Sequence, residues 1–158
     1  MHDFTLDSRL AKDCLVLGKL NISLLLLMNH SLVPWFILVP RKPATEILDL
    51  SASDQAELLE EINLLSAFIK GNFAISKLNI AAIGNIVSQL HVHVVGRDPT
   101  DYCWPNVVWG TREHSPYPAE RVREIGNTLR QVLGDRFTAV DLHKSAIPHP
   151  NRSGNVGD

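Results

Sequence analysis

Residues 88–97 read Ser-Gln-Leu-His-Val-His-Val-Val-Gly-Arg, and this stretch indicates both the fold and the candidate chemistry. Apolar residues that alternate with polar ones are typical of a β-strand with one buried face, because side chains alternate between the faces of a strand. The apolar set of this strand is Leu90, Val92 and Val94. The polar set, expected to form a row on the opposite face, is Gln89, His91 and His93.

Three interpretations of this row are open. The first is structural, with polar residues on the solvated face of an antiparallel sheet. The second is a metal site, because a His-x-His pair on a strand is a familiar zinc-ligand pattern, but such a site needs a further ligand. No cysteine or carboxylate flanks the pair, and the other histidines fall in predicted loops, ends or the tail: His2, His30, His114, His143 and His149. The third, nucleophilic catalysis by imidazole, is the interpretation we favour.

The rest of the chain predicts an α+β fold with a single antiparallel sheet of about five strands. The predicted strands span residues 14–17, 22–29, 35–39, 78–83 and 90–95, and a short helix spans 6–12. The third strand, Trp-Phe-Ile-Leu-Val, has no alternation and is expected to be central and covered on both faces. A long helix capped by Ser51 lies between the third and fourth strands. A C-terminal helix spans about 117–134. Pro118 begins this helix, and its apolar stripe includes Val132.

Length and composition restrict the classes of function. The chain has 158 residues, a formal net charge of −2, 45% hydrophobic residues and 20% charged residues. The near-balance of 15 basic and 17 acidic residues argues against a protein that mainly binds nucleic acid or an anionic membrane. No signal peptide is expected, and the longest apolar run is far too short to span a bilayer, so we expect a soluble, cytoplasmic protein. Two cysteines, Cys14 and Cys103, are too few for a disulfide scaffold.

The segment Gln-Leu-His-Val-His-Val-Val at 89–95 resembles the histidine triad (HIT) signature, His-φ-His-φ-His-φ-φ, with Gln89 in place of the first histidine. Gly84-Asn85 has the spacing of a Gly-Gln pair that precedes the signature in one branch of the family. Residues 28–29 and 35–41 are similar to that branch's ribose-contacting strand and its neighbour. The resemblance covers about residues 10–110. It is strongest to bacterial HIT proteins labelled diadenosine-tetraphosphate hydrolases, which have a segment like Trp-Pro-Asn-Val-Val-Trp-Gly at 104–110.

This resemblance implies one HIT-like domain over residues 1–144, with a loose tail at 145–158. It implies a nucleotide hydrolase or transferase in which His91 attacks the α-phosphate and forms a covalent nucleotidyl-histidine that water then cleaves. By the same resemblance, His93 donates to phosphate oxygens and no metal or other cofactor is needed. The nucleotide-binding residues that it implies are Asn29 at the ribose, with Gly84 and Asn85 at a phosphate or leaving-group oxygen.

The expected substrates are dinucleoside polyphosphates first and nucleoside phosphoramidates second, and the expected assembly is a homodimer. Three departures from the family pattern put the rate and the leaving group in question. Gln89, the third expected catalytic residue, can orient a neighbour but cannot transfer a proton. Ile86 stands where many members have Ser or Thr, and the connection at 83–85 is shorter than in better-known members. The alternative is therefore a catalytically weak or inactive nucleotide-binding protein.

Other side chains have two interpretations each. Trp35, with Leu24 and Leu26, either walls a base pocket or belongs to the core. Trp104 and Trp109 pack over the site or at a dimer interface. Four basic residues either neutralise a polyphosphate or form a solvated rim: Arg41, Lys42, Arg97 and Arg112.

Overall fold

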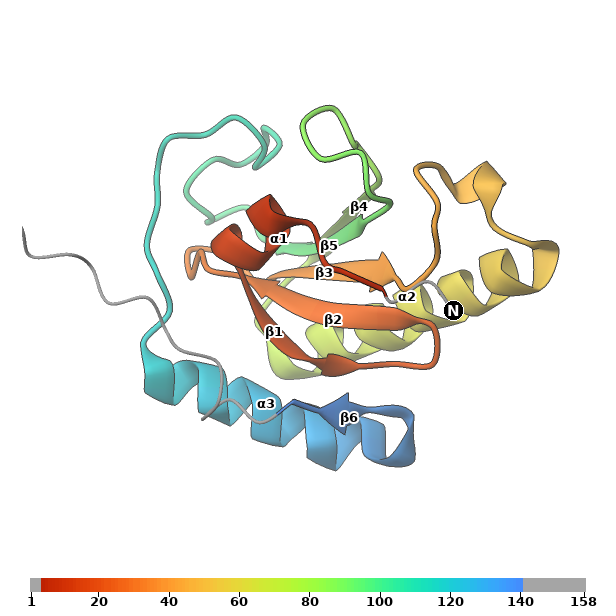
Figure 1. The fold of residues 1–158 in the computed structure, drawn as a ribbon. Coiled ribbons are helices and arrows are strands. Elements are labelled where there is room, and N and C mark those ends of the chain that lie inside the picture. Colours follow the sequence, from red (N-terminus) through yellow and green to blue (C-terminus); the bar gives the residue numbers. More distant parts are fainter. Residues whose placement is uncertain (1–3, 141–158) are drawn as a thin grey trace, which may run out of the picture.

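The computed structural model describes residues 4–140 and contains one antiparallel sheet with helices on both faces (Figure 1). The strands are β1 (Cys14–Lys19), β2 (Ser23–Met28), β3 (Trp35–Pro40), β4 (Lys77–Ala81), β5 (Val92–Arg97) and β6 (Thr138–Ala139). The helices are α1 (Ser8–Asp13), α2 (Ala52–Asn72) and α3 (Ala119–Leu133), with short 3₁₀ turns η1 (Ile47–Asp49) and η2 (Gly134–Arg136). The predicted α+β class is confirmed.

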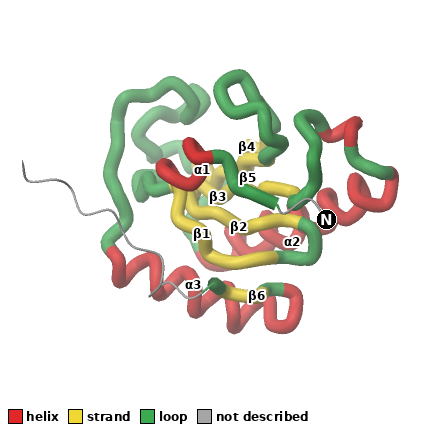
Figure 2. Tube along the Cα trace, viewed as in Figure 1, coloured by secondary structure: helices red, strands yellow, loops and turns green. Residues whose placement is uncertain are grey.

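The strand order is β4-β5-β3-β2-β1-β6, and every pair is antiparallel. All six residues of β3 are buried, which confirms the prediction of a central third strand. Figure 2 shows α2 and α3 together on one side of the strands and α1 with several loops on the other. Each face of β3 is therefore covered, as expected for a strand without polar alternation.

The sheet separates two apolar clusters. The cluster on the α2 and α3 side contains the predicted apolar set of the 88–97 stretch, which packs among Leu65 and Ile69 of α2. The cluster on the α1 side contains Trp35, Val95 and Leu10. Because the two sets of β5 face different clusters, the histidine side of the strand is separated from the main helices by the whole sheet.

Side-chain caps are present at the N-termini of α1 and α2, and the second of them is the predicted cap at Ser51. Asp7 accepts a hydrogen bond from the backbone N–H of Arg9, and Ser51 accepts one from the backbone N–H of Asp54. Both caps satisfy backbone donors that a helix start leaves free. Within α2, the buried Glu61 accepts hydrogen bonds from two backbone N–H groups of the β1–β2 turn and so holds this hairpin against the helix.

Several details differ from the predictions. The fifth strand begins at Val92 instead of Leu90, so Gln89, which lies in a bend, and His91 come just before it. The two-residue strand β6, which pairs with Gly18 and Lys19 of β1, was not predicted because it carries no pattern long enough to detect. In α3, Pro118 is the N-cap, and Val132 is 52% exposed while Leu133 is buried in its place. The predicted tail at 145–158 lies outside the described residues.

Arg97 has neither of the roles that the sequence suggested for it. Its guanidinium is 1% exposed and donates to both carboxylate oxygens of Asp101, at 2.7 and 3.1 Å. It also donates to the side-chain oxygen of Asn79 and to the backbone carbonyl of Asn106. Burial opposes ionisation of Asp101, but the bonds from Arg97 and from backbone N–H groups outweigh it and lower the pKa of this carboxyl to about 2. Arg97 is thus the anchor of the loop after β5.

Replacing Arg97 tests this anchoring role. Arg97→Met leaves the Asp101 carboxylate, whose side chain is 6% exposed, without its partner. We expect a loss of about 3–5 kcal/mol in the free energy of unfolding, because breaking a buried ion pair leaves an uncompensated charge. Urea denaturation of the parent and the variant measures this loss in the free energy of unfolding. Arg121→Met removes the half-exposed pair with Glu124 and should cost several times less; equal losses in the two variants would contradict the anchoring role.

Candidate active site

His91 and His93 lie side by side on the α1 face of the sheet. His93 is the second residue of β5 and stands opposite Ile37 of β3. The ring centroids of the two histidines are 5.0 Å apart, with an angle of 73° between the ring planes. Their exposed fractions are 7% and 6%, so each ring is largely enclosed by the protein.

The hydrogen bond to Nδ1 fixes the proton of His91. Nδ1 lies 2.7 Å from the backbone carbonyl oxygen of Gln89. A carbonyl oxygen can only accept, so Nδ1 carries the proton and donates it. The other nitrogen, Nε2, therefore keeps its lone pair in the neutral ring. This is the arrangement that an imidazole nucleophile requires.

His93 has the opposite arrangement. The indole Nε1–H of Trp35 donates to Nδ1 of His93 at 2.9 Å. An indole N–H can only donate, so Nδ1 of His93 holds a lone pair and the proton of the neutral ring is on Nε2. Burial, followed by the neighbouring His91, lowers the pKa of His93 to about 4. His93 is consequently a neutral N–H donor at physiological pH.

The Nε2 atoms of both histidines are not engaged by the described part of the protein. Neither atom has a hydrogen-bond partner among residues 4–140. Neither is found among the described side-chain atoms that are both enclosed and unpartnered, so both border solvent despite the burial of the rings. Trp109 packs edge-on against His93, with a distance of 5.4 Å between the ring centroids. Among the described residues, the acceptor nitrogen of His91 and the donor nitrogen of His93 are thus both left without a protein partner.

The Gln89 side chain binds the N-terminal segment and not the histidines. Its side-chain oxygen accepts the backbone N–H of Asp7 at 2.9 Å, and its side-chain nitrogen donates to the backbone carbonyl of Thr5 at 2.9 Å. Both ends of the amide therefore hold the N-terminal segment in place. A hollow of about 480 Å³ borders Gln89 and is lined by 5–8, 42–45 and 88–89.

The predicted nucleotide-binding residues are not joined to the histidine pair by any hydrogen bond within the described part of the chain. Asn29 follows β2, and its side-chain oxygen accepts the backbone N–H of Tyr117 at 2.9 Å. Gly84 and Asn85 lie in the turn between β4 and β5, where Gly84 has φ +70°, a left-handed conformation that favours glycine. The Asn85 side chain is exposed.

His30 is a residue near the site that sequence reasoning missed. It is 4% exposed, and its Nε2 lies 3.2 Å from the hydroxyl of Tyr102. Its ring packs edge-on against Trp35 at 6.0 Å and stacks on His114 at 5.6 Å. Its place directly after Asn29, at the end of a buried strand, was the available signal. His30 links the wall of the site to the segment after β5.

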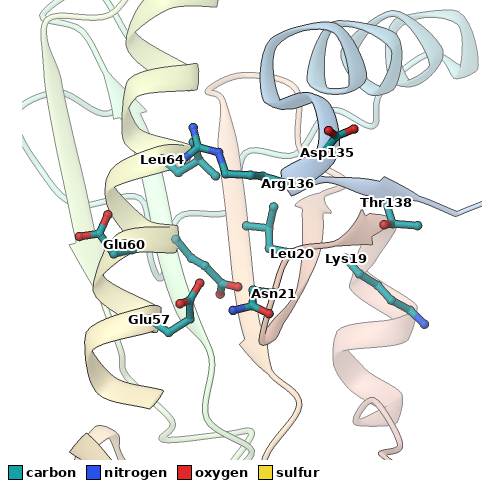
Figure 3. Close-up of a pocket in the computed structure, with 10 residues that line it drawn as sticks. Lys19, Leu20, Asn21, Glu57, Glu60, Leu64, Asp135, Arg136 and Thr138 are labelled. Carbon is teal, nitrogen blue, oxygen red and sulfur yellow. The ribbon is translucent and has the colours of Figure 1, made fainter. Parts of the chain in front are cut away.

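A separate groove lies between α2, the β1–β2 turn and the end of the described chain (Figure 3). It encloses about 460 Å³ and is bordered by Glu57 and Glu60 of α2 and by Asp135 and Arg136. No histidine or cysteine lines it, so it is no rival for the chemistry of the histidine pair. Across residues 4–140, no group of three or more His, Cys, Asp or Glu side chains gathers at a distance suited to a metal ion. Nor is any helix there long and apolar enough to cross a membrane.

Residues 9–100, more than half of the chain, match the family model of the HIT domain. The chain belongs to the HIT domain family. A comparison with curated proteins finds no match.

Solved structures of HIT proteins agree with this assignment. A histidine triad protein from Bradyrhizobium japonicum is 41% identical, with 82% of this chain and 97% of that chain covered and a TM-score of 0.79. One from Marinobacter aquaeolei is 39% identical, with 84% and 98% covered and a TM-score of 0.80. The diadenosine triphosphate hydrolase of Plasmodium falciparum is 17% identical, with 84% and 82% covered and a TM-score of 0.57, a likeness that shows the fold alone.

The HIT match ends at residue 100, before the segment that covers the histidines. This later segment supplies Tyr102 and His114, which pack against His30. It also supplies Trp109, which packs against His93 and Trp35. The wall of the candidate site in this HIT protein is therefore built partly by chain outside the matched domain.

The Gln89 clamp can be tested without substrate. Gln89→Ala removes both hydrogen bonds to the N-terminal segment, and we expect roughly 1–2 kcal/mol lower stability because each net bond contributes about 1 kcal/mol. Hydrogen exchange of the Asp7 amide should accelerate. Ser88→Ala is the matched control, since this neighbouring side chain is exposed. Unchanged Asp7 exchange in Gln89→Ala would refute the clamp.

Proposed function

We propose that this HIT protein hydrolyses a nucleoside phosphate derivative at its α-phosphate through a covalent intermediate on His91. The observation that carries the proposal is the pair of opposite tautomers, with a lone pair on Nε2 of His91 and a proton on Nε2 of His93. The lone pair of His91 forms an N–P bond while the leaving group departs with the electrons of its bond to phosphorus. Water then forms a P–O bond and loses a proton to the solvent, and the N–P electrons return to His91.

His93 stabilises the charge that develops on phosphorus in this proposal. Its Nε2–H donates to a non-bridging oxygen, and the donation does not require a charged ring. Because the pKa of His93 is lowered to about 4, the neutral donor form predominates from pH 5 upward. The remaining proposed contacts are Asn29 with the ribose and Asn85, beside Gly84, with a phosphate or leaving-group oxygen.

Because Gln89 has no proton to give to a leaving group, we favour a polyphosphate as the leaving group. A nucleoside polyphosphate leaves as a stable anion, whereas an amine must be protonated as it departs. Gln89 has no proton to transfer, and its amide is engaged with the N-terminal segment. Dinucleoside polyphosphates are therefore our first choice of substrate, and nucleoside phosphoramidates the second.

The alternative is a HIT protein that binds nucleotides without turning them over. Both functions predict that a nucleoside monophosphate binds, so affinity does not separate them and turnover does. A metal-dependent hydrolase is a third candidate, which predicts zinc in the purified protein and loss of activity with a chelator.

The test of the mechanism is a trapped intermediate. We expect wild-type protein mixed with excess diadenosine tetraphosphate and quenched with base to carry an adenylyl group on the peptide that contains His91. His91→Ala should lose the adduct and at least about a thousandfold in turnover, since the nucleophile is absent. Lys70→Ala, at an exposed position of α2 on the other side of the sheet, is the control and should retain the adduct. Equal turnover by His91→Ala and the parent would refute the mechanism.

We also propose a homodimer that forms along β4. This strand is at one edge of the sheet, where its outer backbone groups have no neighbouring strand within the described chain. Ile80 is 48% exposed, and Ile83 and Ile86 in the following loop are 40% and 78% exposed. An open edge beside exposed apolar side chains favours association.

Light scattering coupled to gel filtration measures the proposed association. The parent should elute with twice the mass of the chain, and Ile80→Glu should shift it to one chain, because a charge at an apolar interface is costly to bury. Leu48→Glu, at a position 80% exposed in η1, is the control and should leave the mass unchanged. A monomeric parent would contradict the proposal.

A further inference from the structure

The register of the sheet places Trp35 beside His93. Trp35 pairs with Val95 and Ile37 pairs with His93, so Trp35 and His93 are diagonal neighbours on adjacent antiparallel strands. Residues in this relation lie on the same face and within reach of a long aromatic side chain. Their ring centroids are 5.7 Å apart. The contact follows from the pairing of β3 with β5 and does not depend on a loop.

The hydrogen bond between them is sheltered from water. Trp35 is 7% exposed and His93 is 6% exposed, and the Nε1–Nδ1 distance is 2.9 Å. If the proton of His93 moved to Nδ1, two N–H groups would face each other in a buried space. The indole would then be left without an acceptor, at a cost comparable to that of an unsatisfied buried donor. The bond therefore selects one tautomer of His93 strongly.

We propose that Trp35 is a positioning residue that holds His93 in its Nε2–H form, so that a hydrogen-bond donor always faces the substrate. This inference rests on the proposed function, in which the Nε2–H of His93 donates to a phosphate oxygen. Without Trp35, the two nitrogens of a neutral imidazole exchange their roles, and an unprotonated Nε2 would repel a phosphate oxygen. The site needs His91 and His93 in opposite tautomers, and two different partners, a carbonyl and an indole, provide them.

Trp109 offers a matched comparison within the same cluster. Its ring centroid is 5.4 Å from that of His93, close to the distance for Trp35. Its Nε1 is buried without a hydrogen-bond partner among the described residues. Replacing either indole removes a similar aromatic contact with His93, but only the replacement of Trp35 removes the hydrogen bond.

Nitrogen-15 NMR of the full-length protein at pH 7.5 tests the proposal directly. We expect the parent to show Nδ1 of His93 as an unprotonated nitrogen and Nε2 as a protonated one, with a scalar coupling between Nε1 of Trp35 and Nδ1 of His93. In Trp35→Phe the two ring shifts should move toward each other, because the tautomers now exchange. In Trp109→Phe the parental pattern should persist. A single Nε2–H tautomer retained in Trp35→Phe would overturn the proposal.

A second variant covers the case in which Trp35→Phe does not fold. Benzothienylalanine at position 35 keeps the size and shape of the indole and replaces only its N–H with sulfur. The expected result is the same mixture of tautomers. The pKa of His93 should also rise relative to the parent, since the bond from Trp35 stabilises the neutral ring. A parental spectrum and an unchanged pKa in this variant would overturn the proposal.

Kinetics separate this inference from the proposed function. For turnover of diadenosine tetraphosphate, Trp35→Phe should lower kcat about two- to tenfold with little change in KM, as expected when one neutral hydrogen bond is lost. A parent without turnover would refute the proposed function, while the NMR comparison would still decide whether Trp35 fixes the tautomer. A tautomer mixture with parental kcat would overturn the positioning role for an active enzyme.

Discussion

The hydrogen bond from Nδ1 of His91 to the backbone carbonyl of Gln89 is the constraint on which the proposed chemistry depends. It holds the proton of the neutral His91 ring on Nδ1 and so leaves the lone pair on Nε2. The bond requires residue 89 only for its backbone, so a glutamine can stand there without loss of this contact. The Gln89 side chain is then free to bind the N-terminal segment, which it does at both ends of its amide.

The central strand connects this site to the stability of the fold. β3 is buried along its whole length, with one face toward α2 and the other toward the histidines. The same strand supplies Trp35, whose indole determines the tautomer of His93. Beyond β5, the buried pair of Arg97 and Asp101 holds the loop that leads to Trp109. The donor and acceptor nitrogens are thus set by packed elements of the sheet.

Periodicity predicted the parts of this structure that repeat along the chain. The alternation at 88–97 was enough to place Leu90 and Val92 on the helix side, and the cap at Ser51 was recognisable from its spacing to Asp54. Contacts between segments that are far apart in the chain could not be predicted from the sequence. Nothing local shows that Arg97 is enclosed by a loop, that Gln89 reaches Thr5, or that a two-residue strand pairs with β1.

The candidate site was predictable to a similar extent. The histidine pair is visible in the sequence because both residues belong to one strand motif. The partners that fix their tautomers are of different kinds, since one is a backbone atom and the other, Trp35, is 58 residues away in the chain. The sequence places Trp35 in a base pocket or in the core, and its hydrogen bond to His93 depends on the register between β3 and β5. Register is a property of the folded sheet, so it was available only from the structure.

The most direct test of the central claim is a long-range proton–nitrogen correlation spectrum of both imidazoles in the unmodified protein at pH 8. Our account predicts mirror-image patterns, with the proton of His91 on Nδ1 and that of His93 on Nε2. The same nitrogen protonated in both rings would contradict it, because the site would then present two donors or two acceptors to the phosphate.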